Sequence, residues 1–291
     1  MSTLKVEQIS KSFHHHQILN QVSFELGASG IYGLLGRNGM GKSTLFKIMT
    51  NQIFADAGQV KFANMDIRKQ PELAARLFLM SETDLYPNSM RVQQALDWTN
   101  KFYDHFDQVF ATKLLDQFGL APHQRIGQLS TGYRTIFKLI VALCVPADFI
   151  FLDEPVLGLD ANYRDLFYQA LIESYTQRPR TFVIATHLIG EIEHLIDHVF
   201  ILVHGELLVN QSTESLLEQS HAVSGPAKVV DDYTENVRVI GSDRLGGLKV
   251  VYVLGDLDET KILPDVVKLE KVALQELFIH LTTTEVAVND N

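Results

Sequence analysis

The sequence predicts an α/β fold built around a mainly parallel β-sheet. Short apolar runs of the kind found in buried strands lie at residues 31–35, 149–152 and 181–185, and helical stretches separate them. Strands that alternate with helices form parallel sheets, because each crossover returns the chain to the same end of the sheet. The first run leads into a glycine-rich loop, and residues 45–49 after the loop have the composition of a helix. We therefore expect a strand, a loop and a helix at the centre of the fold.

Two further elements are predicted around this centre. Residues 4–9 and 22–26 alternate between apolar and polar side chains, which predicts an antiparallel edge sheet. From residue 92 to 120 apolar residues recur at three- and four-residue spacing, so we expect an inserted helical lobe at about residues 88–145. Four aromatic side chains at helical spacing in this lobe are predicted to pack in its core: Trp98, Phe102, Phe106 and Phe110.

The character of the sequence changes after about residue 219. Beyond it we predict a linker or turn at residues 224–226, strands at 237–240 and 249–253, and a helix at 274–281. The residues from 282 to 291 are predicted to be disordered. The chain is therefore divided into a large α/β domain at residues 1–219 and a small α+β accessory domain at 220–291.

Composition narrows the class of protein. The chain has 291 residues, of which 46% are hydrophobic and 21% charged, as in ordinary soluble globular proteins. Its net charge of -10 argues against nucleic acid as a partner. Cys144 is the one cysteine, so no internal disulfide forms and a reducing compartment is expected. There is no signal-peptide pattern and no apolar run long enough to cross a bilayer. We expect a cytoplasmic protein whose membrane role, if it has one, comes through a partner.

The most specific motif is a glycine-rich loop that begins at Gly36 and matches G-x-x-x-x-G-K-[ST] at every fixed position. Glycines let successive backbone N–H groups point at phosphate oxygens, and the following helix adds the positive end of its dipole. Lys42 is expected to bridge the β- and γ-phosphates, and the Ser43 hydroxyl to bind Mg²⁺. The predicted site for a nucleoside triphosphate and Mg²⁺ comprises Gly36, Arg37, Asn38, Gly39, Met40, Gly41, Lys42, Ser43 and Thr44.

Two adjacent acids, Asp153 and Glu154, follow the apolar run at residues 149–152. A buried strand would deliver Asp153 to the neighbourhood of the phosphate loop, where its carboxylate can hold Mg²⁺. Glu154 is then placed to orient or deprotonate a water that attacks the γ-phosphate. The alternative is that both acids are solvated loop residues.

Two weaker motifs complete the set. Ser130 and Gly132 stand where a helix begins, and their hydroxyl and backbone N–H groups can donate to phosphate oxygens. An ordinary helix cap is the alternative for this pair. His187 follows the apolar run at residues 181–185 and could donate to a γ-phosphate, although a lone histidine at a strand end is often a simple loop residue.

Taken in this order, the phosphate loop, the Leu129–Gly132 segment, the paired acids and the histidine resemble the nucleotide-binding domain of the ATP-binding cassette (ABC) transporters. The resemblance covers roughly residues 3–218 and implies a phosphate-loop ATPase fold with an antiparallel edge sheet and an inserted helical lobe. It implies that Phe13 stacks on adenine, that Asp160 lies in the D-loop and that His187 senses the γ-phosphate. It also implies that the catalytic set is Glu154, His187 and Lys42.

The resemblance further implies partners. In that family two domains pair head to tail around two ATP molecules, so that Ser130 and Gly132 would act on the ATP held by the other subunit. ATP binding closes the pair, and hydrolysis opens it and drives a separate membrane-spanning permease. We therefore expect a homodimer or a heterodimer, bound peripherally to the inner face of the cell membrane through an integral-membrane permease.

Several positions depart from the family pattern. Glu82 is the best match for a glutamine that contacts Mg²⁺ and the permease, and its carboxylate would repel the γ-phosphate. Thr131, Tyr133 and Leu157 also replace the usual residues. The lysine, the paired acids and the histidine are intact, so hydrolysis is expected. Glu82 and the short accessory domain resemble the ATPase subunits of bacterial exporters, including those for antimicrobial peptides. The alternatives are a soluble ABC-type ATPase and a slow or non-hydrolysing nucleotide switch.

Overall fold

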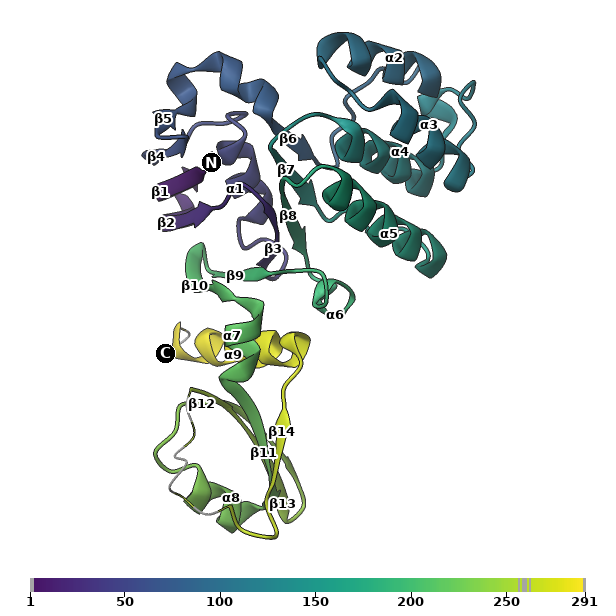
Figure 1. The fold of residues 1–291 in the computed structure, drawn as a ribbon. Helices are drawn as coiled ribbons and strands as arrows, with labels where there is room; N and C mark the ends of the chain where they lie inside the picture. Colours follow the sequence, from purple (N-terminus) through teal and green to yellow (C-terminus); the bar gives the residue numbers. More distant parts are fainter. Residues whose placement is uncertain (1–2, 256, 258–260, 262, 290–291) are drawn as a thin grey trace.

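The computed structural model of the chain describes residues 3–255, 257, 261 and 263–289 (Figure 1). The strands are β1 (Leu4–Phe13), β2 (His16–Leu26), β3 (Gly30–Leu35), β4 (Ala57–Phe62), β5 (Met65–Asp66), β6 (Leu77–Met80), β7 (Phe149–Asp153), β8 (Thr181–Thr186), β9 (His198–Val203), β10 (Glu206–Ser212), β11 (Ser220–Pro226), β12 (Val239–Leu245), β13 (Leu248–Leu254) and β14 (Lys268–Lys271). The α-helices are α1 (Lys42–Met49), α2 (Val92–Phe102), α3 (Gln108–Gln117), α4 (Thr131–Cys144), α5 (Ala161–Gln177), α6 (Ile189–Ile192), α7 (Thr213–Glu218), α8 (Ala227–Tyr233) and α9 (Leu274–Asn289). Short 3₁₀ helices are η1 (Ile67–Lys69), η2 (Pro71–Arg76) and η3 (Ile126–Gln128).

The central sheet has the strand order β10-β9-β3-β8-β7-β6. Neighbouring strands within this sheet run parallel to one another, except that β10 pairs antiparallel with β9. This arrangement confirms the predicted α/β fold with a mainly parallel sheet. The predicted antiparallel edge sheet is also present, with the order β2-β1-β4-β5.

Strand β7 shows why the central sheet is apolar throughout. Phe149 and Phe151 pack in the core shared with α1 and the antiparallel sheet, whereas Ile150 and Leu152 pack in the core shared with the helical lobe. Successive side chains of a strand point to opposite faces, so a sheet covered on both faces needs apolar residues at every position. Burial therefore continues to the last residues of the strand, and it fixes the place where Asp153 emerges.

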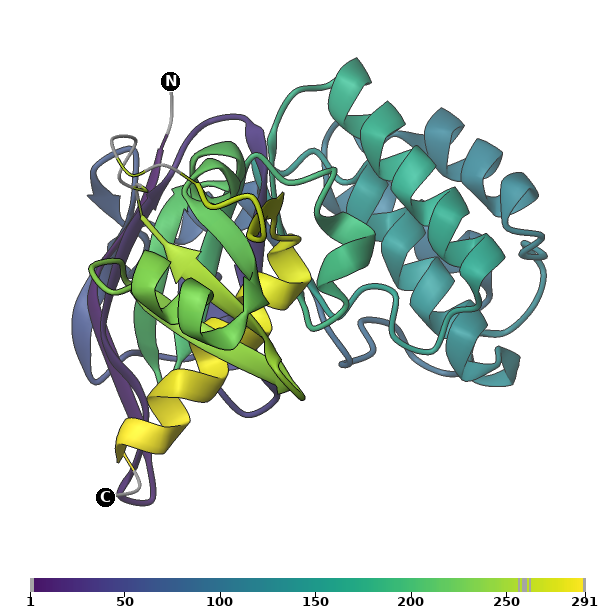
Figure 2. The ribbon, with the colours of Figure 1, turned by 90° about the horizontal axis from the view of Figure 1, so that it is seen from below.

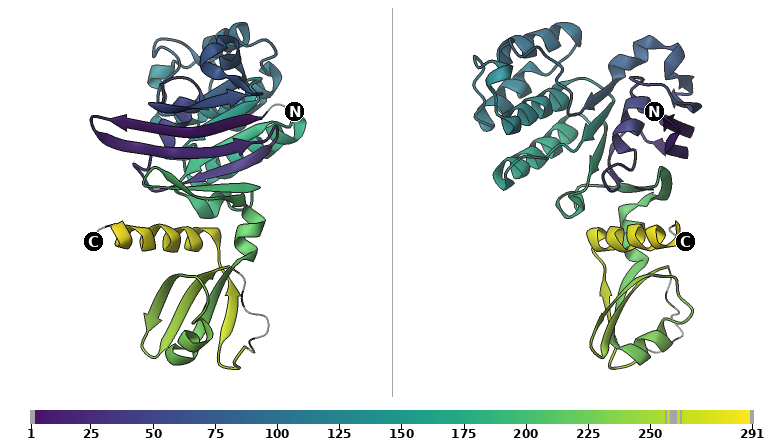
Figure 3. Two further views of the ribbon diagram at one scale, coloured as in Figure 1. Left: turned by 90° about the vertical axis from the view of Figure 1, so that its left-hand side faces the viewer. Right: turned by 180° about the vertical axis from the view of Figure 1, so that it is seen from behind.

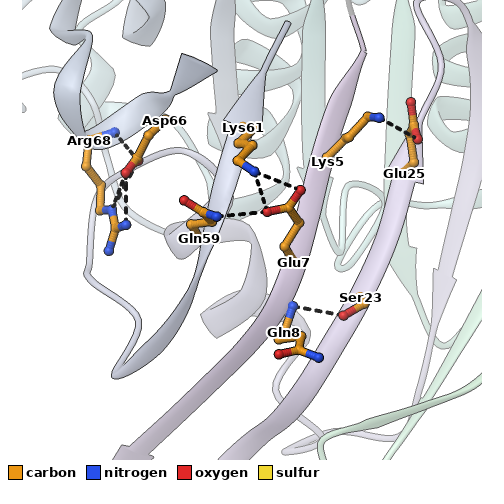
Figure 4. A network of polar contacts seen from close by, with 9 residues as sticks. All are labelled: Lys5, Glu7, Gln8, Ser23, Glu25, Gln59, Lys61, Asp66 and Arg68. Carbon is orange, nitrogen blue, oxygen red and sulfur yellow. Dashed lines mark hydrogen bonds and ion pairs between the residues drawn. The ribbon is translucent and has the colours of Figure 1, made fainter. Parts of the chain in front are cut away.

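The antiparallel sheet carries a polar network on its surface (Figure 4). Glu7 on β1 accepts hydrogen bonds from Gln59 Nε2 at 2.9 Å and Lys61 Nζ at 3.1 Å on β4. The hydrogen bond from Lys61 lowers the pKa of Glu7. Lys5 and Glu25 form a further pair across β1 and β2 at 3.4 Å. Exposed pairs of this kind add little stability. Lys5 stands opposite Glu25 and Glu7 opposite Gln59, while Lys61 is a diagonal neighbour of Glu7, so these pairs favour the observed register.

The helical lobe consists of α2, α3 and α4, and α5 packs beside α4 (Figures 1 and 2). Phe106 and Phe110 are buried, as predicted. The predicted burial of Trp98 and Phe102 is wrong, because their side chains are 62% and 73% exposed. Both lie on α2, which ends at Phe102. Helical spacing identifies one face of a helix, but it does not say whether another element covers that face.

Residues after α7 form an antiparallel sheet of order β12-β13-β11-β14, with α8 packed against β11 and β13. Strand β11 occupies residues 224–226, so the predicted linker there is wrong. Helix α9 lies between this sheet and the central sheet (Figures 1 and 3). It extends to Asn289, which contradicts the predicted disorder of residues 282–289. Residues 290 and 291 lie outside the described residues.

Candidate nucleotide-binding site

The predicted functional residues gather where neighbouring parallel strands end. Strand β3 leads into the phosphate loop, β7 ends at Asp153 with Glu154 following, and β8 ends one residue before His187. Strand β6 ends two residues before Glu82. The strand order β3-β8-β7-β6 makes these four carboxyl ends adjacent. Ligands of open α/β sheets bind at this edge.

A cleft of about 600 Å³ opens at this edge. Most of the predicted residues line it: Phe13, Asn38, Gly39, Gly41, Lys42, Ser43, Thr44, Glu82, Asp153, Glu154 and His187. The ring of Phe13 is 44% exposed, and Lys11 Nζ lies 5.2 Å from its centroid. An exposed ring at a cleft can stack on a planar base.

The phosphate loop has the backbone that its glycines permit. Gly39 and Gly41 have φ values of +84° and +97°, in a region that other residues rarely adopt. Gly41 is the N-cap of α1, which begins at Lys42, so the positive end of the helix dipole lies in the cleft.

Three loop residues are absent from the residues that line the cleft. Gly36 has no room for a side chain, because a Cβ there would lie 2.8 Å from the Leu202 carbonyl oxygen. The side chain of Arg37 donates to Thr283 Oγ1 at 3.0 Å, and the backbone N–H of His204 donates to Met40 Sδ at 3.3 Å. These residues therefore support the loop from outside the cleft.

Lys42 is a buried cation in the cleft, and its side chain is only 6% exposed. Its Nζ donates to the carbonyl oxygens of Gly36 at 2.6 Å and Arg37 at 3.2 Å, and lies 3.8 Å from Glu154 Oε1. Burial lowers the pKa of Lys42, while the carboxylates of Glu154 and Asp153 oppose that shift. The ammonium group is thus held by carbonyl groups of the phosphate loop. Because it is buried, its electrostatic attraction for an anionic ligand is stronger than at an exposed site.

Glu154 is held in an unusual backbone conformation. Its φ is +48°, which is uncommon for a residue with a side chain, and its backbone N–H donates to the Ala185 carbonyl oxygen at 2.8 Å. Oε2 lies 2.9 Å from His187 Nδ1, and Oε1 is buried without a hydrogen-bond partner. Backbone strain and an unpaired buried oxygen are features that collect at functional sites.

Oxygen donors suited to Mg²⁺ stand beside the lysine. Asp153 is hydrogen-bonded to the Ser43 hydroxyl, and burial raises the pKa of Asp153 while that hydrogen bond opposes the rise. Glu82 lies in the same cleft and contributes to raising the pKa of Asp153. Mg²⁺ is usually held by one or two carboxylates together with substrate phosphates and waters. The residues Ser43, Asp153 and Glu82, with the unpaired Glu154 oxygen nearby, fit such an ion.

Ser130, Gly132 and Asp160 lie outside the residues that line this cleft. Ser130 Oγ caps α4 by accepting from the Tyr133 backbone N–H at 3.3 Å, and Asp160 Oδ1 caps α5 by accepting from Tyr163 at 3.0 Å. A Cβ at Gly132 would lie 3.5 Å from the Gly158 carbonyl oxygen, so the starts of the two helices are neighbours. In this single chain the three residues form a second group.

The cleft also contains Leu157, which was noted only as a departure from the family pattern, and four residues that the sequence analysis did not single out: Ile18, Lys47, Ser81 and Thr83. Lys47 follows Ser43 by four positions on α1, so helix geometry could have placed it on the same side. Ser81 and Thr83 flank Glu82. Ile18 has no local signal, because its position depends on how β2 passes the phosphate loop.

Residues 19–157 match the family model described as ABC transporter. The chain carries an ABC transporter ATP-binding domain. This domain is an ATPase domain, as the phosphate loop and the paired acids predict. The resemblance to ABC transporter ATP-binding proteins, predicted from the sequence, is therefore confirmed.

Curated relatives of the ABC domain are ATP-binding proteins of transporters. The ABC transporter ATP-binding protein YtrB of Bacillus subtilis (strain 168) is 27% identical over 216 residues, covering 74% of this chain and 74% of that protein. The lantibiotic transport ATP-binding protein SrtF of Streptococcus pyogenes is 27% identical over 216 residues, covering 72% of this chain and 90% of that protein.

Solved structures share the fold of this ABC domain. An ATP-binding subunit of an ABC transporter aligns with a TM-score of 0.66 at 20% identity, covering 74% of this chain and 92% of that chain. A bacterial Atm1-family ABC exporter with ATP bound aligns with a TM-score of 0.64 at 18% identity, covering 75% of this chain and 40% of that chain. Within the described part of the chain, no helix has the length and apolar character that a membrane span requires.

Proposed function

We propose that this chain is the ATP-hydrolysing subunit of an ABC transporter and that it energises export through a separate membrane permease. The observation that carries the proposal is the single cleft in which Lys42, Asp153 and Glu154 meet. Export is favoured because the relatives include a lantibiotic transport ATP-binding protein and Nod factor export ATP-binding proteins. The subunit would bind the inner face of the membrane through the permease.

The roles follow from the positions of the side chains. Phe13 would stack on adenine, and the loop N–H groups with Lys42 would hold the phosphates. Ser43 and Asp153 would hold Mg²⁺, with Glu82 beside them, and the ion would offset the negative charge of the phosphates. Glu154 would accept the proton of the attacking water at its unpaired Oε1. His187, which contacts Oε2 at 2.9 Å, would orient that carboxylate and sense the γ-phosphate.

We propose that the working unit is a head-to-tail dimer of two ATP-binding subunits. Ser130, Gly132 and Asp160 form a group apart from the chain's own cleft. They could then act on the ATP of a second subunit, with the start of α4 offering free N–H groups to its phosphates. ATP would close the dimer, and hydrolysis would let it open.

The enzymatic part is tested by steady-state phosphate release. We expect activity from the wild-type protein with ATP and Mg²⁺, and loss of at least about 100-fold in Glu154→Gln with ATP binding retained, because general-base catalysis contributes on that scale. Glu25→Gln, a change at an exposed pair on β2, is the matched control and should keep full activity. Equal turnover by Glu154→Gln and wild type would remove Glu154 from the mechanism.

The transport part is tested by purifying Glu154→Gln with ATP from gently solubilised membranes of the native cell. A stoichiometric multi-span membrane protein in the preparation is the expected result, and it would identify the permease. A soluble partner, or an ATP-dependent dimer alone, would favour a soluble ABC-type ATPase instead.

A second candidate is a nucleotide switch that binds ATP with little or no hydrolysis. Glu82 favours it, because this carboxylate lines the cleft close to the phosphate loop and would repel a γ-phosphate. The same phosphate-release assay separates the two functions. ATP binding without turnover in the wild type, with turnover restored in Glu82→Gln, would support the switch.

A further inference from the structure

Helix α9 contacts both sides of the nucleotide site. Near its far end, Thr283 Oγ1 accepts a hydrogen bond from Arg37 of the phosphate loop at 3.0 Å. At its start, the Leu274 backbone N–H donates to Glu193 Oε2 at 3.1 Å. Glu193 follows α6, the short helix that comes directly after His187. One helix therefore touches the segments that follow β3 and β8.

The contact with α6 is close and apolar. Leu274 and Leu277 are fully buried in the same core as Ile189 and Ile192. A Cβ at Gly190 would lie 2.8 Å from Gln275 Oε1, so the absence of a side chain there permits the approach. Glu193 also satisfies one of the N–H groups that the first turn of a helix leaves free. A shift of α6 without α9 would break this packing.

Helix α9 is also held to the C-terminal sheet. Tyr252 of β13 donates to Glu276 Oε1 at 2.7 Å, and its ring stacks on His280 with centroids 3.8 Å apart. Views from three directions place α9 between this sheet and the rest of the molecule (Figures 1 and 3). A displacement of α9 would therefore displace the sheet, and a displacement of the sheet would displace α9.

We propose that α9 positions the nucleotide site, holding Arg37 through Thr283 and the segment after His187 through Glu193. Thr283 and Glu193 are positioning residues in this scheme, since they act through neighbours. The proposal rests on the proposed function, because it gives α9 a role only if ATP binds in the cleft. Coupling between two sites is reciprocal, so ATP must stabilise the docked helix as much as the docked helix favours ATP.

The test measures ATP affinity by equilibrium dialysis and amide hydrogen exchange of residues 274–283, on the full chain with and without ATP and Mg²⁺. We expect ATP at 100 times its Kd to slow exchange in α9 severalfold, up to about 100-fold if the undocked state binds no ATP. In Thr283→Val the slowing should shrink and the Kd for ATP should rise about two- to tenfold, the range expected for one lost hydrogen bond. Glu193→Ala should lower kcat more than it raises KM, because Glu193 holds the segment that follows His187.

Matched controls separate coupling from a merely structural role. Thr112→Val removes a hydroxyl that, like that of Thr283, is exposed on a helix and bonds to the carbonyl four residues earlier. Glu25→Ala removes an exposed carboxylate on β2. Both controls should leave the Kd and the ATP-dependent slowing unchanged. Exchange in β7 reports whether each variant is folded.

Three outcomes would overturn the proposal. If the wild type binds ATP while α9 exchanges equally with and without it, the proposal fails and the proposed function stands. The same follows if Thr283→Val speeds exchange equally in both conditions and leaves the Kd unchanged. If dialysis finds no ATP binding by the folded wild type, both fail together.

Discussion

At the scale of single residues, the site combines a buried cation, Lys42, with a carboxylate, Asp153, whose pKa is raised by burial. Lys42 is nearly inaccessible, and its Nζ lies 3.8 Å from Glu154 Oε1. Replacing it with a neutral residue would remove the cation that faces the phosphates from beside the partly buried acids Asp153 and Glu154. We expect Lys42→Ala to bind ATP about 10- to 100-fold more weakly, the range for a lost charge-assisted hydrogen bond. Equilibrium dialysis checks this, and an unchanged Kd would exclude Lys42 from the site.

The pKa of Asp153 gives a pH-dependent prediction. Burial raises this pKa above its unfolded value of 3.8, so the ionised carboxylate destabilises the nucleotide-free fold. The penalty is fully present above the raised pKa and is relieved as the pH falls through it towards the unfolded value. Without ATP and Mg²⁺, Asp153→Asn should therefore melt roughly 2 °C or more above the wild type at pH 8, since about 1 kcal/mol moves the Tm by this much.

The difference in Tm between Asp153→Asn and the wild type should decrease as the pH is lowered through the raised pKa. The variant should also lose Mg²⁺-dependent ATPase activity. Calorimetric melting curves from pH 8 down to about pH 4, close to the unfolded value of 3.8, provide the measurement. A constant difference in Tm over this range would show that the carboxylate's ionisation is not the cause.

At the scale of elements, Arg180 joins three pieces of the fold. Its guanidinium is buried and donates to the carbonyl oxygens of Val145 and Leu143 at 2.5 Å and to Ser174 Oγ at 2.7 Å, so it links the end of α4 to α5 and the start of β8. Burial lowers the pKa of Arg180 to about 10. The guanidinium carbon Cζ of Arg180 also lies 5.1 Å from the centroid of the Phe182 ring.

We expect Arg180→Met to lower the free energy of unfolding by about 3 kcal/mol, because it leaves buried carbonyl groups unpaired. Urea denaturation followed by far-UV circular dichroism checks this value. Arg178→Met, which removes an exposed guanidinium bonded to Pro146, is the control and should cost less than about 1 kcal/mol. Equal effects of the two changes would contradict the special role of Arg180.

The sequence predicted the elements whose signals are local. The phosphate loop and the apolar runs before Asp153 and His187 identified the strands and most of the cleft, because buried parallel strands and a fixed loop motif are visible within a few residues. The exposure of Trp98 could not be predicted, since periodicity does not reveal whether a face is covered. The strand over residues 224–226 was missed because glycine and proline usually mark turns, yet here they end β11, an inner strand that pairs with both β13 and β14.

The full length of α9 and its contacts could not be predicted from the sequence, for a different reason. The helical pattern fades after Leu281, where threonines replace apolar residues, so its last turns looked disordered. Its contacts with Arg37 and Glu193 join positions 246 and 81 residues apart. No local pattern encodes such pairings.

At the scale of the whole molecule, the separation of Ser130 from its own cleft predicts complementation between subunits. Lys42→Ala damages the phosphate loop and Ser130→Arg damages the helix start, and in a mixed dimer both defects fall in the same site. In a mixed dimer, the intact loop of one subunit would face the intact Ser130 of the other. We expect each variant to be inactive alone and their equimolar mixture to recover up to about a quarter of wild-type ATPase activity, assuming random pairing in symmetric dimers with independent sites.

Phosphate release before and after mixing provides the measurement, with light scattering to follow dimer formation. A mixture of either variant with Glu154→Gln is informative too. Glu154, like Lys42, lines the cleft, whereas Ser130 lies outside it, so the two mixtures combine different defects. A mixture as inactive as its components, despite demonstrated mixed dimers, would argue that each chain hydrolyses ATP within its own cleft.

The hydrogen bond from Leu274 to Glu193 has a consequence for the order of events during synthesis, because it spans 81 positions. At a typical ribosomal rate of about 5–20 residues per second, Leu274 is added roughly 4–16 s after Glu193. During that interval the nascent chain can already form its phosphate loop, while Ile189 and Ile192 lack the helix that will bury them. The newborn protein therefore passes through a stage in which one side of its nucleotide site is assembled and the other still exposes apolar surface to chaperones.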